Sequence, residues 1–168
     1  GWAIRPTFYS HFCGGETIAG CESTISTLAD NQVSTILDYS AEGKDSEFEW
    51  DRTQAEIMRA IQATEGDDRH AFSVFKVSGL ASTALLEKIG LRLKPLENLE
   101  SVGLTLNHDE QSAWERVQER FYSLCAKSAA IGKPVFIDAE ESWIQPTIDA
   151  LAESAMRKWN VEEAIVYN

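Results

Sequence analysis

Apolar residues recur along the chain in two alternating patterns, which are short continuous runs and longer stretches with a spacing of three or four. Short runs bounded by polar residues are typical of buried strands, whereas the wider spacing is typical of helices with one apolar face. The runs predict strands at residues 33–39, 71–77, 135–137 and 163–168. The spacing predicts helices at residues 16–29, 45–64 and 83–89, from 107 or 109 to 131, and after Pro146.

Strands that alternate with helices in this way predict a parallel sheet with right-handed crossovers. The glycine-rich turn of a dinucleotide-binding fold follows none of the predicted strands. We therefore predict an α/β fold, a partial (β/α)₈ TIM-like barrel with about four parallel strands and flanking helices. A complete barrel needs about 250 residues. We expect residues 1–168 to be a single domain, the N-terminal half of such a barrel, with the C-terminal half absent.

Composition excludes several kinds of partner. The chain carries 15 Lys and Arg against 27 Asp and Glu, a net charge of −12 that repels nucleic acid. The sequence contains no run of about 18 apolar residues, the length that a membrane-spanning helix needs, so it predicts no membrane span. Three cysteines without a C-x-x-C pair indicate reduced thiols of an intracellular protein, packed as small hydrophobic side chains. Three scattered histidines give no support to a metal site.

Ionisable residues stand at or just beyond the ends of three predicted strands: Asp38 and Glu42, then Lys76, then Asp138 and Glu140. In a barrel these ends converge on one mouth, where α/β folds place their chemistry. The acids could act as bases or hold cations, and Lys76 could bind an anion or act as a nucleophile. Asp38 fits a loop cap equally well, and Glu42 fits a solvated turn residue equally well.

Four segments in this order resemble the proline dehydrogenase family, and the likeness runs through nearly the whole chain. Each segment alone is a weak signal, whereas four in order are specific. The segments are FCGGET at 12–17, ILDYSAEG at 36–43, VFKVSGLA at 74–81 and IDAEESWIQP at 137–146.

The resemblance implies a flavoenzyme on a distorted (β/α)₈ barrel. It would oxidise L-proline to Δ1-pyrroline-5-carboxylate, in proline catabolism to glutamate, with FAD as the hydride acceptor and a quinone as the final electron acceptor. It implies that Lys76 lies near the flavin and the substrate carboxylate. It also implies that Asp138 and Glu42 each pair with one of two carboxylate-binding arginines, and that Glu140 supports the same site.

The resemblance further implies that the arginine pair and most FAD contacts come after residue 168, so we expect this fragment alone to be inactive and to bind FAD poorly. The implied location of the full protein is the cytoplasm of a bacterium, with peripheral association at the inner face of the membrane, or the mitochondrion of a eukaryote.

Two other interpretations remain open. One is a class I aldolase barrel in which Lys76 forms a Schiff base with a keto substrate. The other is a non-catalytic half-barrel that serves as an interaction domain and self-associates through its exposed edge strand.

Overall fold

The computed structural model describes residues 13–39, 45–93, 99–103 and 105–168. Its centre is a four-stranded parallel sheet in which each strand pairs with the next one along the chain. Sequential order of parallel strands is the arrangement found in (β/α)₈ barrels. The predicted α/β fold with four parallel strands is therefore confirmed. The strands are β1 (Thr35–Asp38), β2 (His70–Phe75), β3 (Val135–Ile137) and β4 (Val166–Tyr167).

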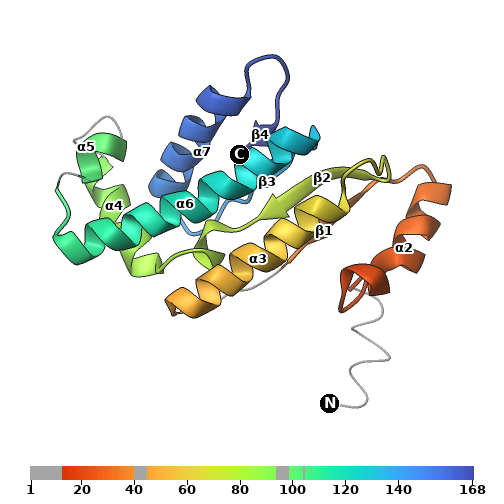
Figure 1. Cartoon of the computed structure of the whole chain (residues 1–168), viewed down its shortest axis with the longest axis horizontal. Helices are drawn as coiled ribbons and strands as arrows, with labels where there is room; N and C mark the ends of the chain where they lie inside the picture. The colour runs from red at the N-terminus through yellow and green to blue at the C-terminus, as the bar shows by residue number, and fades with distance from the viewer. Residues whose placement is uncertain (1–12, 40–44, 94–98, 104) are drawn as a thin grey trace, which may run out of the picture.

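Helices connect the strands and cover one face of the sheet. Figure 1 shows the three longest crossover helices lying together over the strands, with α3 beside α6 and α6 beside α7. A shorter helix, α4, packs against α7 at one end of this layer. The helices are α2 (Ile18–Asp30), α3 (Glu47–Ala63), α4 (Thr83–Leu93), α5 (Leu99–Gly103), α6 (His108–Ile131) and α7 (Gln145–Trp159), and a 3₁₀ turn, η2 (Val77–Gly79), follows β2.

Local signals in the sequence explain where the long helices begin and end. Ser46 caps α3 by accepting a hydrogen bond from the Glu49 amide, and Asn107 forms a capping box with Glu110 at the start of α6. Gly132 ends α6 with a φ of 65°, a left-handed conformation that costs glycine little. Of the two starts that the sequence predicted for the long helix, the structure has the one at Asn107.

The two faces of the sheet differ in burial. The face under the helices carries side chains that are almost fully buried, namely Ser73, Phe75, Val135, Ile137 and Val166. The other face carries Ile36, which is 45% exposed, and a half-buried cluster of Phe72, Phe136 and Tyr167. Phe72 stacks on Phe136 with ring centroids 4.2 Å apart, and Tyr167 contacts both rings edge-on. This second face is thus apolar and partly open to solvent.

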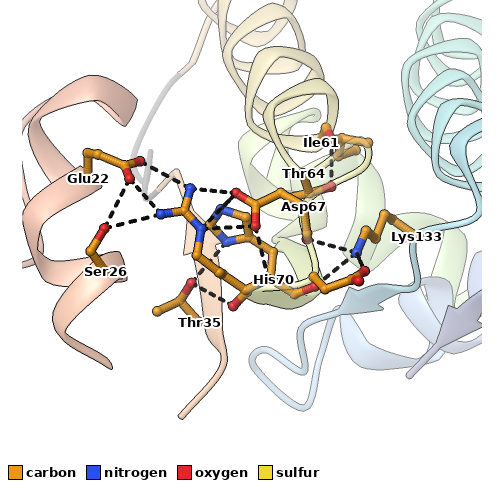
Figure 2. A network of polar contacts seen from close by, with 10 residues as sticks. Glu22, Ser26, Thr35, Ile61, Thr64, Asp67, His70 and Lys133 are labelled. Atoms are coloured by element: carbon orange, nitrogen blue, oxygen red, sulfur yellow. Dashed lines mark hydrogen bonds and ion pairs between the residues drawn. The ribbon is translucent and has the colours of Figure 1, made fainter. Parts of the chain in front are cut away.

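A cluster of charged residues ties the sheet to α2 at the amino ends of the strands (Figure 2). Arg69 binds Asp67 through several hydrogen bonds and reaches across to Glu22 of α2 at 2.5 Å. Lys133, just before β3, donates to the Asp67 carbonyl oxygen at 2.9 Å. In a parallel α/β fold this end of the sheet contributes stability rather than chemistry.

Three of the four strands are shorter than the sequence predicted, whereas β3 has the predicted bounds. β2 ends at Phe75 instead of residue 77, because the Gly79 and Leu80 amides bond to the carbonyl oxygens of Lys76 and Val77 and turn the chain out of the sheet. In the other direction, α4 continues to Leu93 where the sequence predicted residue 89.

The cysteines are free thiols, as predicted, but their packing is not uniform. Cys125 is fully buried in the core, and burial raises the pKa of its thiol to about 12. Cys13 is exposed and Cys21 is half-buried, so the expectation that all three pack as small hydrophobic side chains is wrong. Both lie in or before the first turn of α2, where little of the chain packs against them.

Within the described ranges, no helix is long and apolar enough to cross a membrane. The same part of the chain contains no group of three or more His, Cys, Asp or Glu side chains arranged to hold a metal ion.

Candidate functional site

Lys76 and Asp138 form an ion pair at the carboxyl edge of the sheet. Phe75 of β2 is in register with Ile137 of β3, so the next residue on each chain lies beside the other. The Asp138 amide continues the ladder by donating to the Phe75 carbonyl oxygen at 3.0 Å. Lys76 Nζ then donates to Asp138 Oδ2 at 2.5 Å. The side chains are 25% and 44% exposed, so solvent and ligands can reach the pair.

The Glu140 side chain links the ends of β2 and β3 by accepting a hydrogen bond from a backbone amide. Its Oε1 accepts a hydrogen bond from the Ser78 amide in the turn η2, at 3.0 Å. The Glu140 amide in turn donates to Oε1 of Gln145 at the start of α7, at 2.8 Å. The loop after β3 is thereby fixed both to the turn that carries Lys76 and to the following helix.

A buried arginine side chain stabilises the turn η2. The Arg120 side chain of α6 is 7% exposed and donates to the Leu80 carbonyl oxygen at 3.1 Å, directly after η2. Its guanidinium also pairs with Asp51 at 2.7 Å and with Glu47, both on α3. Charge pairs to a planar guanidinium are directional, so Arg120 fixes the turn relative to two helices.

The structure brings together three of the residues that the sequence singled out, namely Lys76, Asp138 and Glu140. Asp38 ends β1 and lies with Tyr39 in the wall of a separate cavity of about 640 Å³ between α2, β1 and α3. Glu42 lies outside the described residues, so its predicted place at the mouth stays a prediction.

Sequence reasoning missed two residues that shape the site. Ser78 contributes only its backbone amide, for which no side-chain pattern exists. Gln145 receives the Glu140 amide, and its Nε2 donates to Asp149 Oδ1 at 2.6 Å. The signal for Gln145 was its position before Pro146, since a residue at the start of a helix can bond to the preceding loop.

The chemistry offered by this edge is electrostatic positioning. Lys76 presents an ammonium that can bind a carboxylate or the polar edge of a planar ring, and Asp138 presents a carboxylate that can orient a guanidinium. The two groups lie at the carboxyl ends of neighbouring parallel strands, the place where barrel enzymes bind substrates.

Comparison with known proteins identifies similar sequences over almost the whole chain. The family model described as proline dehydrogenase matches residues 21–168. The carbapenem antibiotics biosynthesis protein CarD of Pectobacterium carotovorum subsp. carotovorum is 32% identical over 157 residues, covering 94% of this chain and 39% of that protein.

Mitochondrial proline dehydrogenases give matches of similar extent. Proline dehydrogenase 1 of Arabidopsis thaliana is 27% identical, over 98% of this chain and 39% of its own length. Proline dehydrogenase 1 of Dictyostelium discoideum is also 27% identical, over 98% of this chain and 33% of its own length. The chain thus spans between about one third and two fifths of the length of these relatives.

Proposed function

The chain belongs to the proline dehydrogenase family, and we propose that the protein containing it oxidises L-proline to Δ1-pyrroline-5-carboxylate. In this proposal residues 1–168 are the N-terminal part of the catalytic barrel, and further strands complete the mouth. The observation that carries the proposal is the Lys76–Asp138 ion pair at the carboxyl edge of the sheet.

The two partners have different tasks. The Lys76 ammonium attracts the carboxylate of proline and holds it at the mouth of the barrel. Asp138 holds Lys76 through Oδ2, and its 44% exposed side chain is accessible to an arginine from the rest of the barrel. Such a carboxylate orients a guanidinium, which in turn binds the substrate carboxylate through two parallel hydrogen bonds. Glu140 is a positioning residue, because it fixes the loop of Asp138 to the turn of Lys76.

The cofactor that we propose is FAD. A partly exposed ammonium at the strand ends suits the polar edge of a flavin ring, and Lys76 is the residue that would contact it. The flavin supplies the two-electron oxidation when bound, and the protein supplies orientation. Lys76 and Asp138 therefore contribute by holding the ring of proline in one place and one orientation.

The path of electrons and the location follow from the same proposal. We propose a quinone as the acceptor, and hence peripheral contact of the full protein with the membrane that contains it. The relatives from Arabidopsis thaliana and Schizosaccharomyces pombe are named mitochondrial. A bacterial protein of this type would work at the inner face of the cytoplasmic membrane.

The structure favours this proposal over a Schiff-base aldolase. A Schiff base forms when an amine is free to attack a carbonyl carbon, whereas Lys76 Nζ donates a hydrogen bond to Asp138 Oδ2 at 2.5 Å. Borohydride reduction in the presence of a keto substrate should therefore leave Lys76 unmodified. Covalent trapping of Lys76 would instead support the aldolase.

The decisive experiment is to express the full open reading frame that contains this chain. We expect a yellow protein that reduces a redox dye when L-proline is added, while residues 1–168 alone show no proline-dependent reduction. A colourless full-length protein without proline-dependent activity would overturn the proposal.

The site assignment is tested by Asp138→Ala in the full-length protein. We expect kcat/KM for proline to fall by at least about tenfold, mostly through a higher KM, because the orienting carboxylate is lost. Flavin content should stay near that of the unaltered protein. The matched control is Glu153→Ala, since Glu153 is an exposed acid of α7 that pairs with Arg157 at 3.0 Å. Unchanged kinetics of the Asp138 variant would remove this residue from the site.

A further inference from the structure

The hydrogen bonds of the loop after β3 continue into α7 and from there to the end of β4. Gln145, the first residue of α7, accepts from the Glu140 amide on Oε1 at 2.8 Å and donates from Nε2 to Asp149 Oδ1 at 2.6 Å. The same Asp149 oxygen accepts a hydrogen bond from Asn168 Nδ2 at 2.8 Å. Asn168 directly follows β4, which pairs with β3. One carboxylate on α7 thus joins the ends of two neighbouring strands.

The chemistry of each group fixes the direction of these hydrogen bonds. A carboxylate only accepts hydrogen bonds and a backbone amide N–H only donates them, whereas a glutamine side chain does both. Gln145 therefore turns Nε2 to Asp149 and Oε1 to the Glu140 amide. Removing the Asp149 acceptor removes this constraint on the Gln145 side chain, and with it the fixed acceptor of the Glu140 amide.

The hydrogen bonds lead from Gln145 to the proposed site. Glu140 Oε1 accepts from the Ser78 amide at 3.0 Å, in the turn that follows Lys76. Asp138 lies two residues before Glu140 on the same loop. A change in the orientation of Gln145 is therefore transmitted to the loop that carries Asp138 and to the turn that follows Lys76.

The start of α7 is fixed in the core of the fold. Thr147 is fully buried, and its Oγ1 donates to the Leu86 carbonyl oxygen of α4 at 2.6 Å. The two helices are so close that a Cβ on Gly90 would lie 3.1 Å from Thr147 Oγ1. The backbone of this turn is thus held by packing, and Gln145 and Asp149 link that fixed backbone to the strand ends.

We propose that Asp149 is a positioning residue for the Lys76–Asp138 pair, acting through the two side chains between them. The inference rests on the proposed oxidation of proline, because it assigns Asp149 to the same site. Asp149 holds the loop of Asp138 where a guanidinium and the substrate carboxylate would meet. Through Asn168 it also holds the end of β4 beside that loop.

The test uses the full-length protein that contains this chain and two substitutions at one position. Asp149→Ala removes the acceptor, whereas Asp149→Asn keeps an acceptor oxygen without the charge. Amide hydrogen exchange, read by mass spectrometry of peptides that contain Ser78 or Glu140, reports how firmly these two amides are bonded. We expect exchange in these peptides to rise severalfold in Asp149→Ala and to stay near that of the unaltered protein in Asp149→Asn. Peptides of α6 should be unchanged in both.

Kinetics of the same proteins test the consequence for the site. Asp149→Ala should raise KM for L-proline by about threefold, the size expected for one lost hydrogen bond, with a smaller change in kcat. Asp149→Asn should keep KM near its unaltered value. Combined with Gln145→Leu, Asp149→Ala should raise KM no further than Gln145→Leu does alone, because both act through one link.

The matched control is Glu153→Ala, since Glu153 is an exposed acid one turn further along α7. It should change neither exchange nor KM. If the unaltered protein does not oxidise proline, the proposed function fails, whereas faster exchange in Asp149→Ala alone still supports the link from Asp149 to the loop.

Three results would overturn the positioning role. One is equal exchange in Asp149→Ala and Glu153→Ala. Another is an Asp149→Asn protein that exchanges as fast as Asp149→Ala, because the acceptor would then not matter. The third is an enzyme that oxidises proline with unchanged KM and kcat in Asp149→Ala.

Discussion

His70 shows how burial changes the chemistry of one residue. Its side chain is 3% exposed, Nδ1 lies 2.9 Å from the Thr35 hydroxyl, and Nε2 lies 3.7 Å from Asp67 (Figure 2). Burial lowers the pKa of His70, and nearby Arg69 and Lys133 lower it further, against the opposite effect of Asp67 and Glu22. Beside it, the hydrogen bonds from Arg69 hold the pKa of Asp67 well below its usual range.

We predict that the protein loses stability in two steps as pH falls. The unfolded chain binds a proton at His70 below about pH 6.5, whereas the folded protein resists it, so the free energy of unfolding decreases from that pH downward. Asp67 stabilises the fold above its unfolded pKa of about 3.9, and this contribution is lost as pH falls further. Denaturant unfolding measured from pH 8 to about pH 2, in half-unit steps, covers both steps and tests their order.

Two variants assign the steps to their residues. His70→Gln should flatten the decline that begins near pH 6.5, because glutamine does not titrate. Asp67→Asn should lower stability at neutral pH and weaken the decline at more acidic pH. If His70→Gln leaves the upper step unchanged, another group causes it.

Arg120 links elements instead of acting at a single point. From α6 its guanidinium reaches Glu47 and Asp51 on α3 and the Leu80 carbonyl oxygen after η2, and it lies 5.9 Å from the Trp50 ring centroid. Glu47 is 41% exposed and Asp51 is 67% exposed, so both carboxylates can be hydrated if the cation is removed. The lasting loss is then the packing of Arg120 and the hydrogen bond to Leu80.

We predict that Arg120→Met lowers the free energy of unfolding by about 2 kcal/mol, since one buried carbonyl oxygen loses a charged donor. The matched control is Arg157→Met, because Arg157 is 77% exposed and makes only a surface pair within α7. The control should change stability by no more than about 0.5 kcal/mol. Equal effects of the two variants would show that Arg120 does not link the helices to the turn. Chemical denaturation of both variants at neutral pH measures the difference.

The elements differ in how well the sequence predicts them. Lys76 and Asp138 could be predicted as neighbours, because parallel strands with helical crossovers place their carboxyl ends along one edge. The contacts of Arg120 could not be predicted, because a single polar residue on the apolar stripe of α6 gives no signal of what it binds. The link from Arg69 to Glu22 joins residues far apart in the sequence, and its two charges carry no periodic signal.

The sheet as a whole has one face under helices and one that is partly open. On the open face Ile36 is 45% exposed, beside Phe72, Phe136 and Tyr167. Apolar surface of this kind favours association, and β1 and β4 are edge strands of the described sheet. We propose that the rest of the barrel covers this face in the full-length protein. Self-association of residues 1–168, which the interpretation as an interaction domain expects, would then arise from the uncovered face.

We predict that residues 1–168, expressed alone, self-associate through this face. Sedimentation at several concentrations should show an apparent mass that rises with concentration. Ile36→Glu should weaken association by about tenfold, because it places a charge in the apolar contact. The matched control, Leu91→Glu, changes a 62% exposed residue of α4 away from the sheet and should leave association unchanged. Circular dichroism of both variants checks that the helices persist. A chain that stays monomeric at every concentration would show that the open face is not an association surface, and equal effects of the two variants would place the contact elsewhere.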